Sequence, residues 1–355
     1  MKYKIIITGG AGFIGSTLAL FLKRDFPSSE IITFDNLKRR GSELNLPRLK
    51  KAGITFIHGD IRNPEDLEQL SVFDLLLECS AEPSVLAAFS GDAAYMIHTN
   101  LVGTSNCLEI ARKFKADILF LSTSRVYPFR AIQSLCFDER DSRLELNERQ
   151  SVKGVSQKGI SEEFPLEGVR SLYGATKLAS ELLITEYSDM YGLKSVINRC
   201  GVVSGPWQMG KVDQGFAVLW IARHLFAGKL SYIGFGGKGK QVRDILHVND
   251  LYSLICKQLQ DLHRINGQIF NVGGGSKNSV SLLEFTQIVK EITGKTISIN
   301  SVAETRPADV PYYVSDCSKV ERTMNWHPTY TVHQVVEEIT HWIENNQLQL
   351  KSVLE

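Results

Sequence analysis

The beginning of this chain places a glycine-rich turn between a short apolar strand and a helix, and this order constrains the fold more than any other feature. The apolar run Lys4–Thr8 is followed by Gly9, Gly12 and Gly15, and helical periodicity extends over Gly12–Arg24. Glycines allow a tight turn and let backbone N–H groups approach a pyrophosphate closely, while the helix N-terminus adds positive partial charge. The order predicts a dinucleotide-binding strand–turn–helix unit.

An acidic residue at the end of the second expected strand indicates which dinucleotide is bound. Asp35 lies twenty residues after Gly15, where a carboxylate can accept hydrogen bonds from a ribose 2′,3′-diol. The same carboxylate would repel a 2′-phosphate, so NAD is favoured over NADP, although Arg39 and Arg40 nearby would soften this preference. The alternative is a glycine turn with no ligand. Strand, glycines, helix and acid agree in order and distance, which favours the cofactor.

The first 200 residues alternate short β-rich runs with longer helical patterns, which is typical of a parallel sheet covered on both faces. The expected strands are Lys4–Thr8, Glu30–Asp35, Thr55–His58, Phe73–Glu78, Asp117–Ser122 and Ser195–Cys200, and the clearest helices are Gly12–Arg24, Ala93–Phe114 and Tyr173–Tyr191. We predict an α/β protein with a doubly wound parallel sheet of Rossmann type and a smaller α+β substrate-binding lobe. The NAD-binding domain would span residues 1–204, with 240–265 returning to it, and the lobe 205–239 and 266–345.

The segment Phe129–Arg170 breaks this rhythm, because it is polar and has no sustained period. Loops of such length inside a compact domain are usually functional. We therefore expect a flap over an active site.

Composition and charge exclude several classes of function. A net charge of +1 over 355 residues gives no reason to expect nucleic acid or a membrane surface as partner. No apolar run approaches the roughly 18 residues that span a bilayer, and the first residues lack a signal-peptide pattern. The six cysteines are far apart, without C-x-x-C or zinc-like spacing. We expect reduced thiols, no metal and a cytoplasmic protein.

Tyr173 and Lys177 lie four residues apart in an expected helix, so their side chains can meet on one face. A free phenol has a pKa of about 10, and a nearby ammonium together with a positive nicotinamide ring lowers it. Tyr173 can then accept a hydroxyl proton while hydride leaves the same carbon, and Lys177 can also hold the cofactor ribose. Among eleven tyrosines only Tyr173 has lysine at the fourth following position. The alternative is an incidental pair on a surface helix.

The fifth expected strand ends in residues that carry hydroxyl side chains. Ser122, Thr123 and Ser124 fall at the carboxyl edge of the sheet, where ligands bind in open parallel sheets. A hydroxyl there can donate a hydrogen bond to a reacting oxygen. The alternative is a helix cap or a turn cluster.

With these motifs together, the chain resembles the extended short-chain dehydrogenase/reductase family of NAD-dependent epimerases and dehydratases, almost end to end. Further stretches that carry the resemblance are Gly59-Asp60-Ile61, Asn100 with Gly103-Thr104, Val126-Tyr127 and Gly239–His247. They are typical of family members that act on nucleotide-diphosphate sugars.

The resemblance implies roles for further residues. Phe13 and Ile14 would lie against the pyrophosphate, Asn36 beside the adenosine end, Asp60 and Ile61 at the adenine edge, Ser80, Ala81 and Glu82 beneath the cofactor, with Asn100 and Ser122 also in the cofactor set. Thr123 would take the family's Ser/Thr role and Ser124 would lie on the substrate side. Arg243 resembles the arginine that grips the substrate diphosphate, and Arg306 looks like a second one, a role that suits the planar guanidinium. The alternative for each arginine is an ordinary surface ion pair.

The residues after Thr123 reduce the number of reactions that the family resemblance allows. The family's 4,6-dehydratases have an Asp-Glu pair there and its decarboxylases a Glu, whereas this chain has Ser124 and Arg125, so dehydration is disfavoured. The stretches that look closest to CDP-paratose 2-epimerases, also called CDP-tyvelose epimerases, are Phe34–Leu37, Gly59–Asn63, Gly159–Glu162, Asp213–Gly215 and Gly239–His247. Pro128, Val202 and Ser204 depart from the family pattern on the substrate side, which leaves the nucleotide base and the sugar open.

The leading hypothesis is therefore an NAD-dependent epimerase that acts at C2 of a CDP-deoxyhexose through a transient keto sugar. A UDP-hexose 4-epimerase would use the same three groups. The third hypothesis is a non-catalytic protein that binds NAD or a nucleotide-sugar. The joint presence of Thr123, Tyr173 and Lys177 disfavours it. The helices Ala93–Phe114 and Tyr173–Tyr191 resemble the family's pair that forms a dimer bundle, so we expect a homodimer or homotetramer. Alternatively, both simply pack on the sheet of one subunit.

Overall fold

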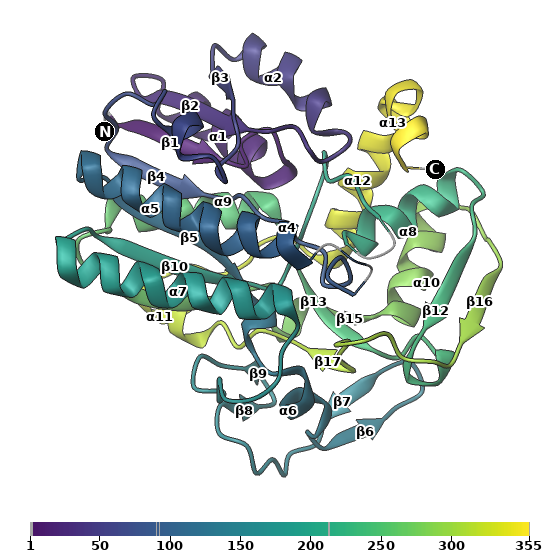
Figure 1. Ribbon diagram of the computed structural model, residues 1–355. Coiled ribbons are helices and arrows are strands. Elements are labelled where there is room, and N and C mark those ends of the chain that lie inside the picture. The colour runs from purple at the N-terminus through teal and green to yellow at the C-terminus, as the bar shows by residue number, and fades with distance from the viewer. Residues whose placement is uncertain (1–2, 90, 92, 212–213, 355) are drawn as a thin grey trace. The chain divides into compact units, whose positions relative to one another are not determined.

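The computed structural model describes residues 3–89, 91, 93–211 and 214–354 (Figure 1). Asp213, one of the residues that carry the resemblance, lies outside this range. The chain forms two units: the first contains Met1–Thr123, Leu172–Arg199 and Tyr252–Ile269, and the second contains Ser124–Ser171, Cys200–Leu251 and Phe270–Glu355. The segment Ser124–Ser171 thus groups with the second unit by its contacts. The predicted assignment of residues 1–204 with 240–265 to cofactor binding, and of 205–239 with 266–345 to substrate binding, stays a prediction.

The first unit is built on a sheet with the strand order β14-β10-β5-β4-β1-β2-β3. These strands are β1 (Lys4–Thr8), β2 (Glu30–Asp35), β3 (Thr55–His58), β4 (Leu75–Glu78), β5 (Asp117–Thr123), β10 (Ser195–Cys200) and β14 (Gln268–Val272), the last of which leads into the second unit. β1 pairs in parallel with both β2 and β4. Because the strand order reverses between β1 and β4, the sheet is doubly wound, as the sequence predicted.

The strands form where the sequence is apolar without interruption, because both faces of this sheet are covered. Ile5, Ile6 and Ile7 of β1 are all buried. Ile6 and Phe34 share one core cluster with side chains from the neighbouring strands and helices. Burial of these large side chains fixes the register, since a slip by one residue would exchange the two faces.

Helices cover this sheet, and α5 and α7 lie side by side along it (Figure 1). The helices are α1 (Phe13–Asp25), α2 (Leu46–Lys51), α3 (Pro64–Leu67), α4 (Ala93–Ile97), α5 (Gly103–Phe114), α7 (Leu172–Tyr191) and α9 (Val248–Gln260), whose first residues belong to the second unit, with a 3-10 turn at Ser42–Asn45. No described helix combines the length and apolar character that crossing a membrane requires.

The predicted helix Ala93–Phe114 differs from the sequence expectation in one respect. A π-helical turn at His98–Val102 joins α4 to α5. Such turns are rare and frequently occur at functional sites. This one contains Asn100, whose side chain is fully buried and hydrogen-bonds residues from two other segments.

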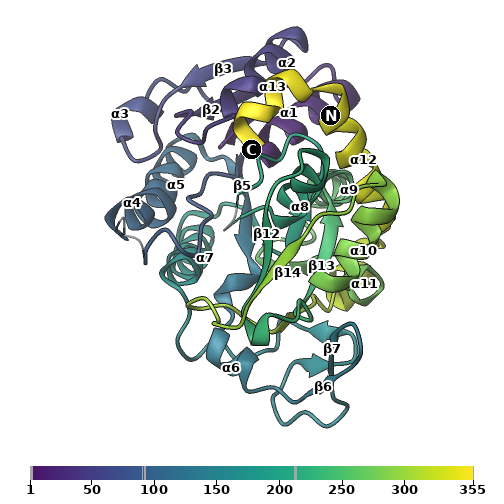
Figure 2. The ribbon, with the colours of Figure 1, turned by 90° about the vertical axis from the view of Figure 1, so that its right-hand side faces the viewer.

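The second unit contains a four-stranded sheet and a group of helices that pack on one another (Figure 2). Its sheet comprises β11 (Val202–Ser204), β13 (Val242–His247), β15 (Ser279–Ser281) and β17 (Tyr312–Tyr313); β12 (Leu230–Ile233) pairs with β16 (Ile299–Val302); its helices are α8 (Phe216–Leu225), α10 (Leu282–Thr293), α11 (Ser318–Met324), α12 (Val332–Asn345) and α13 (Gln347–Leu354), with 3-10 turns at Ser124–Val126, Phe235–Gly237 and Ser276–Asn278.

The segment Phe129–Arg170, expected to be an aperiodic flap, has short regular elements within the second unit. It forms α6 (Phe129–Gln133), the hairpin β6 (Phe137–Glu139) with β7 (Leu144–Leu146), and the hairpin β8 (Val155–Ser156) with β9 (Gly159–Ile160). These strands are too short to give a readable period. The side chain of Asn271 donates to the carbonyl oxygen of Ile160 (2.9 Å) and so anchors this segment to β14.

Candidate active site

The turn between β1 and α1 leaves no room for side chains at Gly9 and Gly15, two of the three predicted glycines. Gly9 has φ +62°, and a Cβ on it would lie 2.8 Å from the carbonyl oxygen of Cys79. A Cβ on Gly15 would lie 2.3 Å from the carbonyl oxygen of Gly9. α1 begins after Gly12, which has no side chain to cap it, so the N–H groups of Phe13 and Ile14 are left as donors at the helix end. This cradle fits a pyrophosphate.

Asp35 holds the glycine turn from the neighbouring strand. Its Oδ2 accepts a hydrogen bond from the N–H of Ala11 (3.1 Å) and its Oδ1 accepts one from the N–H of Leu37 (2.7 Å). Burial raises the pKa of the Asp35 carboxyl, and the hydrogen bonds from Leu37 and Ala11 oppose this rise. The carboxylate therefore lies at the tip of the cradle, where the sequence predicted a ribose contact.

Asn36 and Asp60, both predicted to lie at the adenosine end, are in direct contact. Asn36 donates from Nδ2 to Asp60 Oδ2 (2.9 Å), and Arg62 forks onto the same carboxylate at 2.9 and 2.6 Å. Burial disfavours the charge of Asp60, but the hydrogen bonds from Arg62 and Asn36 outweigh it and lower its pKa to about 2. Ile61 is buried beside them. Arg62 is a member of this cluster that was not predicted.

The long helix α7 presents Tyr173, Lys177 and Glu181 at four-residue intervals on one buried face. Tyr173 is only 9% exposed and Lys177 only 1% exposed. An incidental pair on a surface helix would be solvated, because lysine is almost never fully buried without a partner. Burial therefore favours the functional interpretation of the Tyr–Lys spacing.

The ammonium group of Lys177 contacts one residue from each of two neighbouring strands, β4 and β5. Its Nζ is 3.9 Å from Oε2 of Glu78, which ends β4, and 3.8 Å from the ring centroid of Phe120 in β5. The sequence prediction did not include Glu78. An acid at the end of the apolar run Leu75-Leu76-Leu77 was the available signal.

The end of β5 is tied to α7 by a buried network. Ser122 donates a hydrogen bond from Oγ to Glu181, and Arg199 of β10 forks onto the same carboxylate, with Nη2 2.7 Å from Oε2. The next residue, Thr123, is the last of β5 and is buried as well. The hydroxyl of Ser122 thus has a structural partner, and its predicted cofactor contact stays a prediction.

The residues after β4 are braced by the predicted Asn100. The N–H of Glu82 donates to Asn100 Oδ1 (2.8 Å), and Asn100 Nδ2 donates to the carbonyl oxygen of Glu82 (3.1 Å) and to Oγ1 of Thr176 in α7 (3.4 Å). The N–H of Ser80 donates to Glu78 Oε1 (2.9 Å). Glu78 and Asn100 thereby hold the two ends of the stretch Ser80-Ala81-Glu82, along which the resemblance placed the cofactor.

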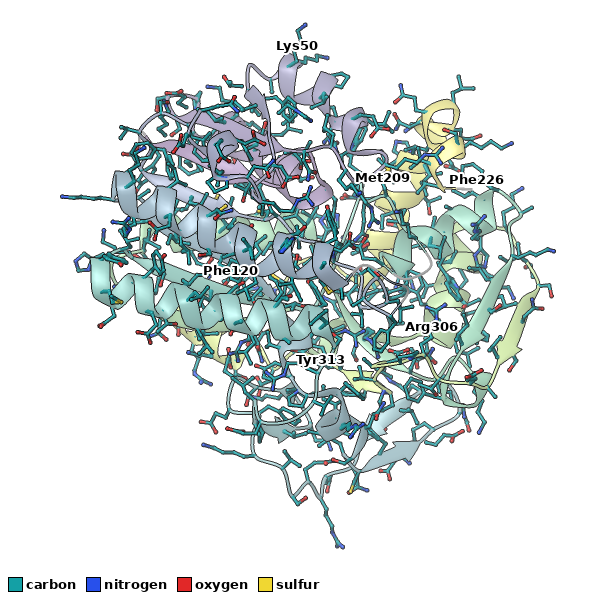
Figure 3. All side chains as sticks on the ribbon, in the orientation of Figure 1. Lys50, Phe120, Met209, Phe226, Arg306 and Tyr313 are labelled. Carbon is teal, nitrogen blue, oxygen red and sulfur yellow. The ribbon has the colours of Figure 1, made fainter. Side chains whose placement is uncertain are left out.

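In the second unit, the predicted Arg243 contacts the segment 306–310, to which the predicted Arg306 belongs. Arg243 donates to Oδ1 of Asp309 (2.9 Å) and to the carbonyl oxygen of Val310 (2.7 Å). Burial lowers the pKa of Arg243 to about 10, so its guanidinium stays charged at neutral pH. Arg306 begins this segment (Figure 3), and its carbonyl oxygen accepts the N–H of Asp309 (3.2 Å).

Arg125 joins this group, although the sequence interpretation used it only as a missing acid. Its Nη2 is 3.9 Å from Asp309 Oδ1, and its Nη1 donates to the carbonyl oxygen of Ala308 (3.2 Å). Ser124 begins the same 3-10 turn, Ser124–Val126. Two guanidiniums therefore share the carboxylate of Asp309. Within the described residues no group of acidic, histidine or cysteine side chains could hold a metal ion.

A dinucleotide cradle and a buried Tyr–Lys pair on one α/β unit define an enzyme of the dinucleotide-dependent oxidation–reduction type. Residues 5–273 match the model of the NAD dependent epimerase/dehydratase family, and the chain belongs to this family. NAD is therefore its cofactor, as the sequence predicted.

The relatives are similar over nearly their whole length. A CDP-paratose 2-epimerase of Salmonella typhi is 30% identical over 352 residues, which cover 96% of this chain and 98% of the relative. A dTDP-glucose 4,6-dehydratase of Escherichia coli (strain K12) is 27% identical, with 97% and 93% covered. The UDP-glucuronic acid 4-epimerase of Bacillus cereus, solved with UDP-glucuronic acid and NAD, has a TM-score of 0.78 at 25% identity and covers 96% of this chain, which covers 99% of it.

Proposed function

We propose that the protein is a nucleotide-sugar epimerase that inverts C2 of a CDP-linked deoxyhexose by oxidising it to a keto sugar and reducing it from the opposite face. The buried Tyr173–Lys177 pair on α7 carries this proposal, because it would supply a base next to the nicotinamide of bound NAD. The similarity to a CDP-paratose 2-epimerase supports the sugar and the carbon. Ser124 and Arg125, in place of the acids that dehydration needs, support epimerisation.

The chain's own residues divide the chemistry among them. Bound NAD would take up hydride from the sugar carbon and return it later. Tyr173 accepts the proton of the sugar hydroxyl as the hydride leaves and gives it back when the hydride returns. Thr123 donates a hydrogen bond to the same oxygen. Lys177 stabilises the phenolate by its charge and holds the cofactor ribose. No net oxidation occurs, because the hydride that leaves the sugar would return to it.

The arginines of the second unit would hold the diphosphate while the keto sugar turns to present its other face. In the structure the carboxylate of Asp309 forms an ion pair with the guanidinium of Arg243 and lies near that of Arg125. A diphosphate carries more charge than one carboxylate and offers bidentate oxygens. We propose that it displaces Asp309 from these arginines and that Arg306 joins it from the same segment.

Purified protein with no added NAD should interconvert a CDP-linked deoxyhexose and its C2 epimer, as NMR of the sugar would show. Substrate with deuterium at C2 should react more slowly and keep its label, whereas deuterium at C4 should have no effect. Accumulation of keto sugar with stoichiometric NADH would indicate a dehydrogenase and contradict the proposal.

A UDP-hexose 4-epimerase is the second candidate, since Thr123, Tyr173 and Lys177 do not determine which carbon they meet. The similarity to a UDP-glucuronic acid 4-epimerase favours it. Conversion of UDP-hexoses, with the isotope effect at C4 and none at C2, would establish this activity instead.

We expect the variant Arg243→Met to raise KM about 10–100-fold with a smaller effect on kcat, since a hydrogen bond to a charged group contributes about 1.5–3 kcal/mol. Steady-state kinetics measure both constants, and competition by CDP reports binding directly. Arg264→Met is the matched control, because Arg264 forms an exposed ion pair with Asp261 in the first unit. An unchanged KM in Arg243→Met would remove this arginine from the substrate site.

Apolar side chains on the outer face of α7 support the proposal of a homodimer. Leu182 and Met190 are 63% and 66% exposed, and Tyr191 and Val102 near them are exposed as well. Leu182, Met190 and Tyr191 lie on α7, and Val102 ends the π-helical turn directly before α5, which runs beside α7 (Figure 1). Exposed apolar patches commonly mark protein interfaces. Sedimentation equilibrium gives the mass, and a monomer at all concentrations would contradict this proposal.

A further inference from the structure

A buried carboxylate that the mechanism above leaves unused lies next to its lysine. The side chains of Glu78 and Lys177 are 1% and 2% exposed, and Oε2 of Glu78 is 3.9 Å from Nζ of Lys177. Among the described residues no donor forms a hydrogen bond with this Oε2. The carboxylate thus presents one whole oxygen to the ammonium group.

The other oxygen of Glu78 is fixed by its surroundings. Oε1 accepts the N–H of Ser80 (2.9 Å) and the hydroxyl of Thr8 from β1 (3.4 Å). These donors belong to the rigid carboxyl ends of two paired central strands, so the carboxylate can turn little. The Phe120 ring also packs against the ammonium, a favourable contact for a cation.

Burial of a carboxylate opposes its ionisation and needs a compensating charge. Burial raises the pKa of Glu78, and the charge of Lys177 opposes that rise. Other titratable groups nearby are Cys107 of α5, whose pKa is raised by burial and by Glu78, and Tyr173, one turn before Lys177. Glu181 lies one turn after Lys177, and its carboxylate is paired with Arg199 of β10. Burying a glutamate at this position lowers the folding stability, so we expect its charge to have a role toward Lys177.

We propose that Glu78 is a positioning residue that keeps the Lys177 ammonium charged and directed toward Tyr173 and the cofactor ribose. The inference rests on the proposed function. Without the carboxylate, a buried lysine favours its neutral form, which neither stabilises a phenolate nor donates as strongly to ribose hydroxyls. Glu78 therefore acts through Lys177 and touches no reacting atom.

The variant Glu78→Gln keeps the shape of the side chain and removes its charge. Loss of a buried anion lowers the pKa of the neighbouring cation and of any nearby phenol, so both limbs of the pH profile move in the same direction. We expect the optimum of kcat/KM to move to lower pH by about one unit, since an opposite charge at about 4–6 Å shifts a pKa by 1–3 units. NAD should also dissociate severalfold more readily, measured by titration without substrate.

Two further variants keep the test decisive. Glu78→Asp retains the charge but withdraws it from Lys177, so its pH optimum should lie below that of the wild type and above that of Glu78→Gln. The comparison with the wild type can be made even if the glutamine variant does not fold. Glu65→Gln removes an exposed carboxylate of the same unit and should change nothing.

A folded Glu78→Gln protein with the wild-type pH optimum and NAD affinity would overturn the inference and leave Glu78 a structural residue. If the glutamine variant fails to fold, an unshifted optimum in Glu78→Asp has the same consequence. Failure of the proposed function would show differently, as a wild-type protein that leaves CDP-linked sugars unchanged. The NAD titration remains informative in that case, because it needs no substrate.

Discussion

Replacing Tyr173 with phenylalanine is expected to lower kcat by about 10²–10⁴-fold, the contribution that a positioned general base typically makes. The phenyl ring fills the same buried space on α7, so the variant loses only the hydroxyl. NAD should remain bound, because the glycine cradle and Lys177 are intact. Single-turnover kinetics on the nucleotide-sugar, with NAD quantified after denaturation, separate loss of chemistry from loss of cofactor.

Tyr187 offers a matched control on the same helix. Its hydroxyl donates to Glu109, and burial together with this hydrogen bond raises its pKa to about 12, which disqualifies it as a base. Tyr187→Phe should therefore keep full activity. If Tyr173→Phe were equally active, the phenol would have no part in the chemistry, and a protein that binds NAD without catalysis would have to be considered again.

The central strands could be predicted from the sequence because their apolar runs reflect burial on both faces. β1, β2, β3 and β10 begin and end at the expected residues. β4 begins at Leu75, two residues later than expected, and β5 extends one residue further, to Thr123. Ends of elements depend on single hydrogen bonds, which a pattern of apolar residues does not encode.

The hairpins within Phe129–Arg170 could not be predicted, because distant segments hold them. The N–H of Leu144 donates to the carbonyl oxygen of Lys240 (3.0 Å), and that of Ile160 to Val314 (2.8 Å). Strands of two or three residues carry no period of their own. Their positions follow from partners that are about 100 or more residues away in the chain.

In the site, too, contacts within one helix could be predicted from the sequence, whereas contacts between distant elements could not. The spacing of Tyr173 and Lys177 within one helix could be read from the sequence, because side chains four residues apart meet on one face. Glu78 and Asp309 acquire their meaning only from partners on other elements, Lys177 and Arg243 respectively. An isolated acid at a strand end or in a loop carries no such signal.

The largest effect on stability is expected from Glu181→Met. Glu181 lies one turn after Lys177 on α7, and both its oxygens receive hydrogen bonds from Arg199 of β10 at 2.7 to 3.2 Å. The two side chains are 2% and 4% exposed. Removal of one partner leaves a buried charge without compensation, which costs about 3–5 kcal/mol. Thermal unfolding at a fixed NAD concentration should show a clear drop in the midpoint, since bound cofactor itself stabilises the fold.

The double variant Glu181→Met/Arg199→Met distinguishes the loss of an ion pair from the loss of packing. A buried pair replaced by apolar side chains of similar volume is often neutral or stabilising, so the double variant should regain most of the lost stability. Its activity should nevertheless stay below that of the wild type, because Ser122 donates to Glu181 and thereby fixes the end of β5, where Thr123 follows. A double variant no more stable than Glu181→Met would mean that the pair contributes through its packing. Full activity in it would mean that Thr123 is held in place without this network.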